Sequence, residues 1–124
     1  MKLILKTAFI VMLASLAFAG EKAPKSKVSP EAPKPTLIFF MNPNGSPCQM
    51  QDQILLKSKA DLEKLVQVRY VKTTIPTDRE IFYQYGIRSL PNLILTDAQG
   101  KELHRFAPGI QEIEVIMNTL TTVK

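Results

Sequence analysis

The sequence predicts an α/β fold class, with a mixed four-stranded sheet and helices on both of its faces. Three observations lead to this prediction. Residues 36–41 form an apolar run of strand length that leads into a turn and a helix start, and residues 66–71 alternate like a second strand. Residues 92–96 and 101–106 read as a hairpin. A closing amphipathic helix follows, so the expected order is β-α-β-α-β-β-α.

The first strand and the turn after it carry the clearest local signals. The run Thr36-Leu37-Ile38-Phe39-Phe40-Met41 is apolar after its first residue, which predicts a strand buried on both faces. Asn42-Pro43-Asn44-Gly45 predicts a tight turn, because its proline presets φ and its last two residues tolerate a positive φ. We then expect a helix capped by Ser46, with Pro47 at its first position and Gln49 completing a capping box.

The helix that follows this turn is predicted to be kinked. Met50, Ile54 and Leu55 fall on one helical face, which we expect to point toward the core together with Met41. A restart after Ser58 should carry helical structure to the edge of the second strand.

The second half of the chain contains two further helices. Thr77 and Glu80 predict a capping box for a short helix over residues 78–85, which ends at Gly86. The apolar stripe of the last helix comprises Ile110, Ile113, Ile116, Met117 and Leu120. Because strand-helix-strand crossovers are right-handed, the first two strands should be parallel, whereas the hairpin is antiparallel.

The N-terminus reads as an export signal. Lys2 and Lys6 precede a mostly apolar stretch over residues 3–16, and Ala17-Phe18-Ala19 supplies the small residues of a cleavage site. We expect residues 1–19 to be removed after Ala19, leaving no stable membrane span. The mature protein would then act outside the cytoplasm, most simply in a bacterial periplasm.

Residues 20–35 contain four prolines and four lysines and read as a solvated linker. Residues 36–124 suffice for one small domain. From Thr36 onward the chain has ten basic and nine acidic residues, a balance of +1. That balance provides no electrostatic surface for nucleic acid, so no nucleic-acid partner is expected.

Three stretches of the sequence resemble the thioredoxin fold family. Phe39–Met50 is similar to the strand and loop in which a C-x-P-C motif opens the first core helix. Tyr85–Leu95 resembles the segment with a cis-proline before a strand, and Asp97–Gly109 resembles the terminal hairpin and the glycine after it. The resemblance covers about residues 36–121 and implies a thioredoxin-like domain.

The chain departs from the family pattern at the motif itself. The family's attacking cysteine corresponds to Gly45, so the motif reads Gly45-Ser46-Pro47-Cys48. Asn44 stands where the family commonly has an aromatic residue. We also expect the family's extra strand and helix before the active-site strand to be missing, because the linker composition does not favour them.

Cys48 is the only cysteine of the chain and the candidate catalytic residue. Dithiol exchange needs one thiol to attack and another to resolve the mixed disulfide, so this chain cannot complete that cycle alone. The helix start favours a thiolate, whereas burial favours the neutral thiol. With Gly45 leaving it less covered, we expect Cys48 to be partly accessible and to form mixed disulfides with exported proteins or small thiols, or a disulfide-linked homodimer.

Two alternatives stay open at this point. Cys48 can be a small buried hydrophobe at the base of the helix. The domain can also be a non-catalytic peptide-binding or chaperone-like module. Its groove would then lie between the loop Gly45-Ser46-Pro47 and Pro91. The resemblance implies a cis Leu90-Pro91 bond beside Cys48, with the Leu90 backbone free to pair with an extended peptide.

No cofactor or metal is expected. Cys48 and Met50 are soft ligands, but they are two residues apart on a helix and do not share a face. Met41 and Met50 are better explained as core residues, and His104 as a surface residue of the hairpin.

Overall fold

The computed structural model of the protein describes residues 33–123. The predicted signal peptide and nearly all of the predicted linker lie outside the described residues. Between Pro33 and Val123, no helix has the length and apolar character needed to cross a bilayer.

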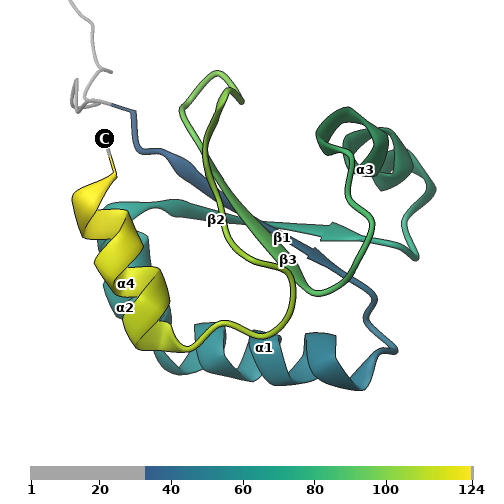
Figure 1. Cartoon of the computed structure of the whole chain (residues 1–124), viewed down its shortest axis with the longest axis horizontal. Coiled ribbons are helices and arrows are strands. Elements are labelled where there is room, and N and C mark those ends of the chain that lie inside the picture. Colours follow the sequence, from purple (N-terminus) through teal and green to yellow (C-terminus); the bar gives the residue numbers. More distant parts are fainter. Residues whose placement is uncertain (1–32, 124) are drawn as a thin grey trace, which may run out of the picture. The chain divides into compact units, whose positions relative to one another are not determined.

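The predicted fold class is confirmed: a mixed four-stranded sheet carries helices on both faces (Figure 1). In chain order, the strands and helices are β1 (Thr36–Met41), α1 (Ser46–Lys57), α2 (Lys59–Leu65), β2 (Gln67–Lys72), a 3₁₀ turn (Pro76–Asp78), α3 (Arg79–Tyr85), β3 (Asn92–Thr96), β4 (Glu102–Arg105) and α4 (Ile113–Thr122). The strand order is β2-β1-β3-β4. As predicted, β1 and β2 are parallel and β3 and β4 are antiparallel.

The strand β1 is buried on both faces and separates two hydrophobic clusters. Leu37 and Phe39 face α1, α2 and α4, where they pack with buried residues of all three helices. Ile38 and Phe40 face α3, and the Phe40 ring meets the Phe82 ring edge-on at 5.3 Å. The predicted apolar run is thus the shared centre of both clusters.

The start of α1 differs from the predicted capping box. Gly45, rather than Ser46, occupies the N-cap position, and Pro47 is the second helical residue. No side chain caps this helix end. The Gln49 side chain instead donates a hydrogen bond to the Pro43 carbonyl at 2.9 Å, because the turn brings that carbonyl within its reach.

Two other predictions for helices are wrong in detail. The capping box at Thr77 does not form; a 3₁₀ turn occupies this position, and the Asp78 carboxylate accepts the Lys72 N–H at 2.9 Å. The last helix begins at Ile113, so Ile110 lies outside it and is 37% exposed.

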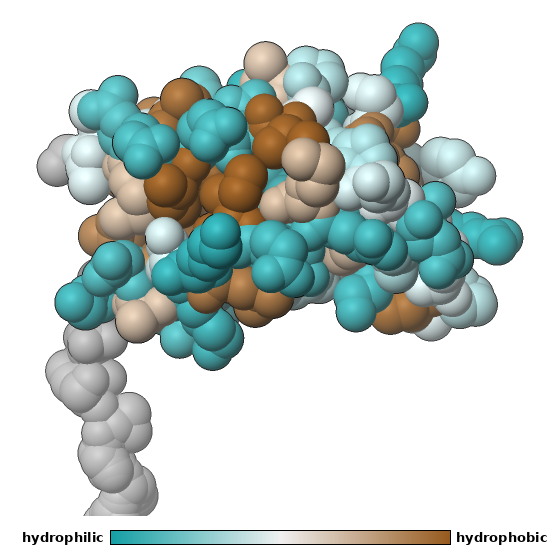
Figure 2. All heavy atoms as spheres, turned by 90° about the horizontal axis from the view of Figure 1, so that it is seen from below, coloured by the Kyte–Doolittle hydropathy of each residue, from teal (hydrophilic) through white to brown (hydrophobic). Residues whose placement is uncertain are grey.

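The prediction that Met50 is a core residue is wrong, because its side chain is 55% exposed. Gln51 takes the inward position beside it and is fully buried. Figure 2 shows apolar side chains lying between polar ones on the side of the domain where α1 forms the outer layer. The helix is therefore less regularly amphipathic than its sequence predicts.

Gln51 joins α1 to the segment before α4. Its Nε2 atom donates to the Gln111 carbonyl at 3.0 Å, and its Oε1 atom accepts the Gln111 N–H at 2.6 Å. Both polar atoms of this buried side-chain amide are therefore hydrogen-bonded to the backbone of one residue, 60 positions away in the chain.

Replacing Gln51 with alanine should strongly destabilise the domain. The change leaves two backbone groups of Gln111 without partners, at a cost of about 2 to 4 kcal/mol in the free energy of unfolding. Urea denaturation measures this loss. The matched control is Gln53→Ala, an exposed glutamine on the same helix, and equal effects of the two substitutions would contradict the assignment.

The Tyr70 hydroxyl donates a hydrogen bond to the Asp52 carboxylate at 2.6 Å and ties β2 to α1. Burial, and then the hydrogen bond to Asp52, raise the pKa of Tyr70 above its ordinary value of 10.0. Because the folded state holds the neutral phenol more tightly, its contribution to stability is complete below pH 10.

We expect the free energy of unfolding to fall as the pH rises above about 10, since the phenol of Tyr70 then ionises first in the unfolded chain. Tyr70→Phe should flatten this part of the stability profile. Tyr83→Phe, which changes a tyrosine that is 78% exposed, should leave the slope as it is. Denaturation curves between pH 8 and pH 11 test both variants.

Candidate thiol site

The turn between β1 and α1 presents Cys48 at the end of the central strand. The Gly45 N–H donates to the Asn42 carbonyl at 2.9 Å and closes the turn. The Asn42 side chain accepts the Asn44 N–H at 3.0 Å, which adds an Asx turn inside it. Gln49 binds the turn from the helix side through Pro43. The backbone that surrounds the thiol is thus held by three independent hydrogen bonds.

Cys48 is buried, with 2% of its surface exposed. The prediction that it is partly accessible is therefore wrong for this conformation. Its Sγ atom lies inside the turn, where it accepts a hydrogen bond from the Asn42 N–H at 3.3 Å. Met41 and Leu55 belong to the same hydrophobic cluster. No charged side chain of residues 33–123 forms a hydrogen bond with this sulfur.

Gly45 lies directly against the thiol. A Cβ atom added at this glycine would stand 3.8 Å from the Cys48 Sγ and 3.4 Å from the Asn42 carbonyl oxygen. The Gly45 backbone, with φ −89° and ψ 131°, has a conformation that any L-residue adopts. The glycine is therefore not required by the turn, and its missing side chain leaves space next to the sulfur.

The second segment of the site precedes β3. The Leu90-Pro91 peptide bond is cis. Pro91 is buried, and its carbonyl accepts the Gly109 N–H at 3.1 Å. Leu90 is half-buried and packs against the cluster that contains Cys48. No backbone hydrogen bond joins Leu90 to another of the described residues, so its N–H and C=O remain able to pair with a bound segment.

Only some of the site residues predicted from the sequence lie near the thiol. Gly45 lies next to Cys48, since a Cβ added at the glycine would stand 3.8 Å from the sulfur, and Leu90 packs against the cluster that contains Cys48. Ser46 and Pro47 are exposed at the rim of the turn, where a partner can touch them but the thiol does not.

Asn42 and Gln51 were missed by sequence reasoning. Asn42 holds the sulfur through its backbone N–H, which carries no sequence signal. Gln51 supports the site indirectly, because it fixes Gln111 two residues after the glycine that binds Pro91. Its only sequence signal was its position four residues before Leu55, on the same helical face. Asn92, directly after Pro91, has a buried Oδ1 atom without a partner among the described residues, which nothing in the structure explains.

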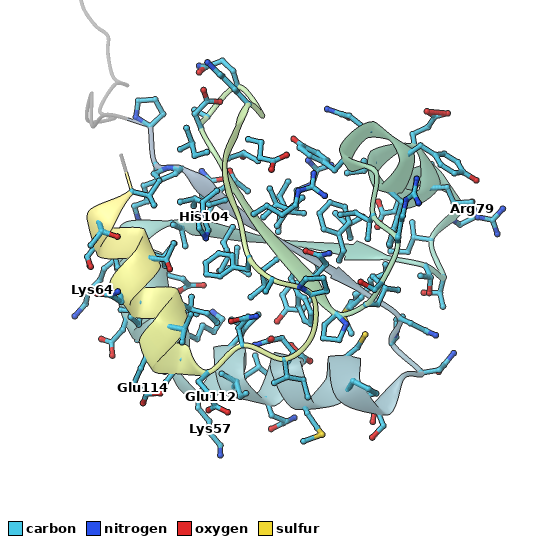
Figure 3. All side chains as sticks on the ribbon, in the orientation of Figure 1. Lys57, Lys64, Arg79, His104, Glu112 and Glu114 are labelled. Atoms are coloured by element: carbon cyan, nitrogen blue, oxygen red, sulfur yellow. The ribbon has the colours of Figure 1, made fainter. Side chains whose placement is uncertain are left out.

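None of the six side chains labelled in Figure 3 belongs to the turn that contains Cys48. The labelled side chains in Figure 3 belong to helix ends and to β4, and His104 packs its ring edge-on against Phe106 at 4.9 Å. Across residues 33–123, no three His, Cys, Asp or Glu side chains gather closely enough to hold a metal ion.

The fold and the thiol at the start of its first core helix define the class of the protein: a thioredoxin-fold protein with one cysteine where the class has two. The model of the thioredoxin-like domain family matches residues 23–124, so the chain belongs to the thioredoxin-like family. A thioredoxin-like domain suggests a redox-type function.

Two curated relatives agree with this assignment. The chain is 36% identical over 91 residues to a thioredoxin-like protein of a Synechocystis species, a match that covers 72% of this chain and 81% of the relative. It is 39% identical over 61 residues to a thioredoxin of Rickettsia bellii, covering 49% of this chain and 56% of that protein.

Solved structures support the fold alone. A thioredoxin-fold protein of Helicobacter pylori superposes with a TM-score of 0.61 at 20% identity, covering 72% of this chain and 69% of that one. The thioredoxin-2 of a malaria parasite superposes with a TM-score of 0.62 at 17% identity, covering 71% and 82%.

Replacing Gly45 with cysteine should create an internal disulfide. The new Cβ would start 3.8 Å from the Cys48 Sγ, close enough for a disulfide after a small local shift. After mild oxidation, the variant should contain no free thiol and weigh two hydrogen atoms less than the reduced form. Intact-mass spectrometry with thiol counting checks this. Gly45→Ala is the control and should keep its single thiol, whereas two free thiols in oxidised Gly45→Cys would contradict the geometry.

Proposed function

We propose that this protein carries out thiol-disulfide exchange through Cys48 alone, with a partner that supplies the second sulfur. The partner would be an exported protein with an exposed disulfide, or a small disulfide, met in the periplasm after the signal peptide has been removed behind Ala19. The observation that carries the proposal is the space beside the sulfur at Gly45, where a relative with the full motif has its attacking cysteine.

The exchange step balances within the two molecules. The Cys48 thiolate attacks one sulfur of the partner's disulfide, a new S–S bond forms, and the other sulfur leaves as a thiolate that takes up a proton. One disulfide is consumed and one is formed, so no further oxidant is needed. The product is a mixed disulfide between the domain and its partner.

Burial of the sulfur sets how this step can occur. Because Cys48 is 2% exposed, the turn from Asn42 to Pro47 must open before a foreign sulfur reaches it. The hydrogen bonds that close the turn are local, so such an opening does not require the domain to unfold. A partner that binds beside Leu90 through its backbone would favour the open turn and would be selected over small reagents.

A second candidate function is favoured by the same burial. If Cys48 never becomes accessible, the domain is a non-catalytic module that binds an extended peptide along the unpaired Leu90 backbone. The cysteine would then serve only as a small apolar residue in the cluster around Met41 and Leu55.

The reactivity of the wild-type Cys48 thiol separates the two functions, and Cys48→Ser, which lacks the thiol, is the blank. We expect the wild-type protein, incubated with oxidised glutathione, to gain one glutathione by intact-mass spectrometry, at a rate well below that of a free cysteine. The serine variant should gain none. Gly45→Ala should react more slowly than wild type, because its methyl group fills the space beside the sulfur.

The rate of modification decides between local opening and an inert core cysteine. Modification through local opening should proceed at denaturant concentrations far below the unfolding transition, with little dependence on denaturant. A rate that follows global unfolding across the whole urea range would rule out the exchange function and leave the binding module.

A further inference from the structure

The outer edge of the sheet at β2 has backbone groups that find no partner among residues 33–123. The Gln67 N–H donates to Pro35 and the Thr73 N–H donates to Met41, so odd-numbered residues of β2 point their backbone groups toward β1. Val68 and Tyr70 therefore point their N–H and C=O groups outward. Because β2 is a terminal strand of the sheet, no described strand pairs with them (Figure 1).

One end of this edge is closed and the other is open. The Asp78 carboxylate occupies the outward N–H of Lys72, which prevents pairing there. Nothing comparable covers Val68 and Tyr70 among residues 33–123. The free part of the edge can accept an extended segment of about four to six residues, in the manner of strand addition.

Side chains of β2 alternate between two hollows on the two faces of the sheet. On the face of α1 and α2, a small apolar hollow of about 120 Å³ is lined mainly by Leu55, Leu56, Leu62, Val68 and Tyr70. Leu56 is 46% exposed there. On the opposite face, a larger and more polar hollow of about 610 Å³ contains Arg69, together with the turn after β3.

The two hollows require different side chains from a bound strand. Arg69 forms no ion pair with any described residue. Asp97 is the only acidic residue among the described residues that line the larger hollow, and its carboxylate already accepts the N–H groups of Gln99 and Lys101 at 2.9 Å. A residue opposite Arg69 would therefore meet an uncompensated cation, whereas residues opposite Val68 and Tyr70 would meet apolar surface.

We propose that the β2 edge is an interaction surface for an extended segment of another protein, with an acidic residue opposite Arg69 and apolar residues on both sides of it. The segment would add a fifth strand to the sheet. This surface is separate from the turn that contains Cys48, which follows the carboxyl end of β1.

A second copy of this chain fits the same edge less well. Antiparallel pairing of two β2 strands about a centre at Arg69 places the two arginines directly opposite each other, and like charges in that position destabilise a sheet. Centred on Tyr70, the pairing needs the Lys72 N–H that Asp78 already occupies. An acidic partner meets neither obstacle.

The full-length protein can be tested with a blocked, fluorescein-labelled peptide of alternating sequence, TVEVEVT, and its lysine counterpart, TVKVKVT. Fluorescence anisotropy should show tighter binding of the glutamate peptide. Arg69→Glu should weaken its binding about tenfold and reverse the preference between the two peptides. Arg79→Glu is the matched control, since Arg79 starts α3 beyond the opposite end of β2 (Figure 3), and it should leave the preference unchanged.

Amide hydrogen exchange locates the binding. The bound glutamate peptide should slow exchange at Val68 and Tyr70 while leaving Gln67 and Arg69, whose amides already face β1, as they were. Methylating the backbone nitrogens of the peptide valines, which lie opposite Val68 and Tyr70, should abolish binding. Methylating those of the glutamates, which point away from β2, should not. Failure of both peptides to bind, or indifference to Arg69→Glu, would overturn the proposal. So would a dimer, seen by sedimentation, that protects the same two amides.

Discussion

The burial of β1 on both faces is the constraint on which the rest of the structure depends. Five of its six residues are buried, and they supply the centre of both hydrophobic clusters. Since β1 also pairs with β2 on one side and β3 on the other, it has no free edge and no free face. Because β1 is held on both faces and along both edges, the start of the turn after it is held in place as well, and that turn positions Cys48.

Around that point the molecule combines a rigid support with a weak local closure. Gln51 and Gly109 connect α1, the segment before α4 and Pro91 through buried or backbone hydrogen bonds. The turn itself is closed by short-range bonds within Asn42–Gln49. A partner can open such a turn without disturbing the clusters beneath it, because the bonds that must break are few and lie within one short segment. The site is thus suited to selective access more than to rapid exchange with solvent.

The absence of a strand beyond β2 in the described residues has a second consequence. The sheet retains an edge whose two faces differ in chemistry, apolar toward Leu56 and cationic at Arg69. The thiol turn lies beside the carboxyl end of β2, where the Thr73 N–H binds the Met41 carbonyl, whereas the free edge lies at Val68 and Tyr70. The two surfaces also use different interactions. One offers a sulfur and the other offers backbone hydrogen bonds with a charge, so the two surfaces can be tested and altered independently.

The order of the elements, the buried central strand and the turn at Gly45 could be predicted from the amino-acid sequence, because they follow from local apolar patterns and turn residues. The sequence also shows that the chain has only one thiol, Cys48, because its other sulfur atoms belong to methionines. It could not place Met50 outside and Gln51 inside, since both fit a helical face and only the position of Gln111 decides between them. Tertiary structure likewise decided that Cys48 is covered, because its burial depends on segments that lie far from it in the chain and pack against the same cluster.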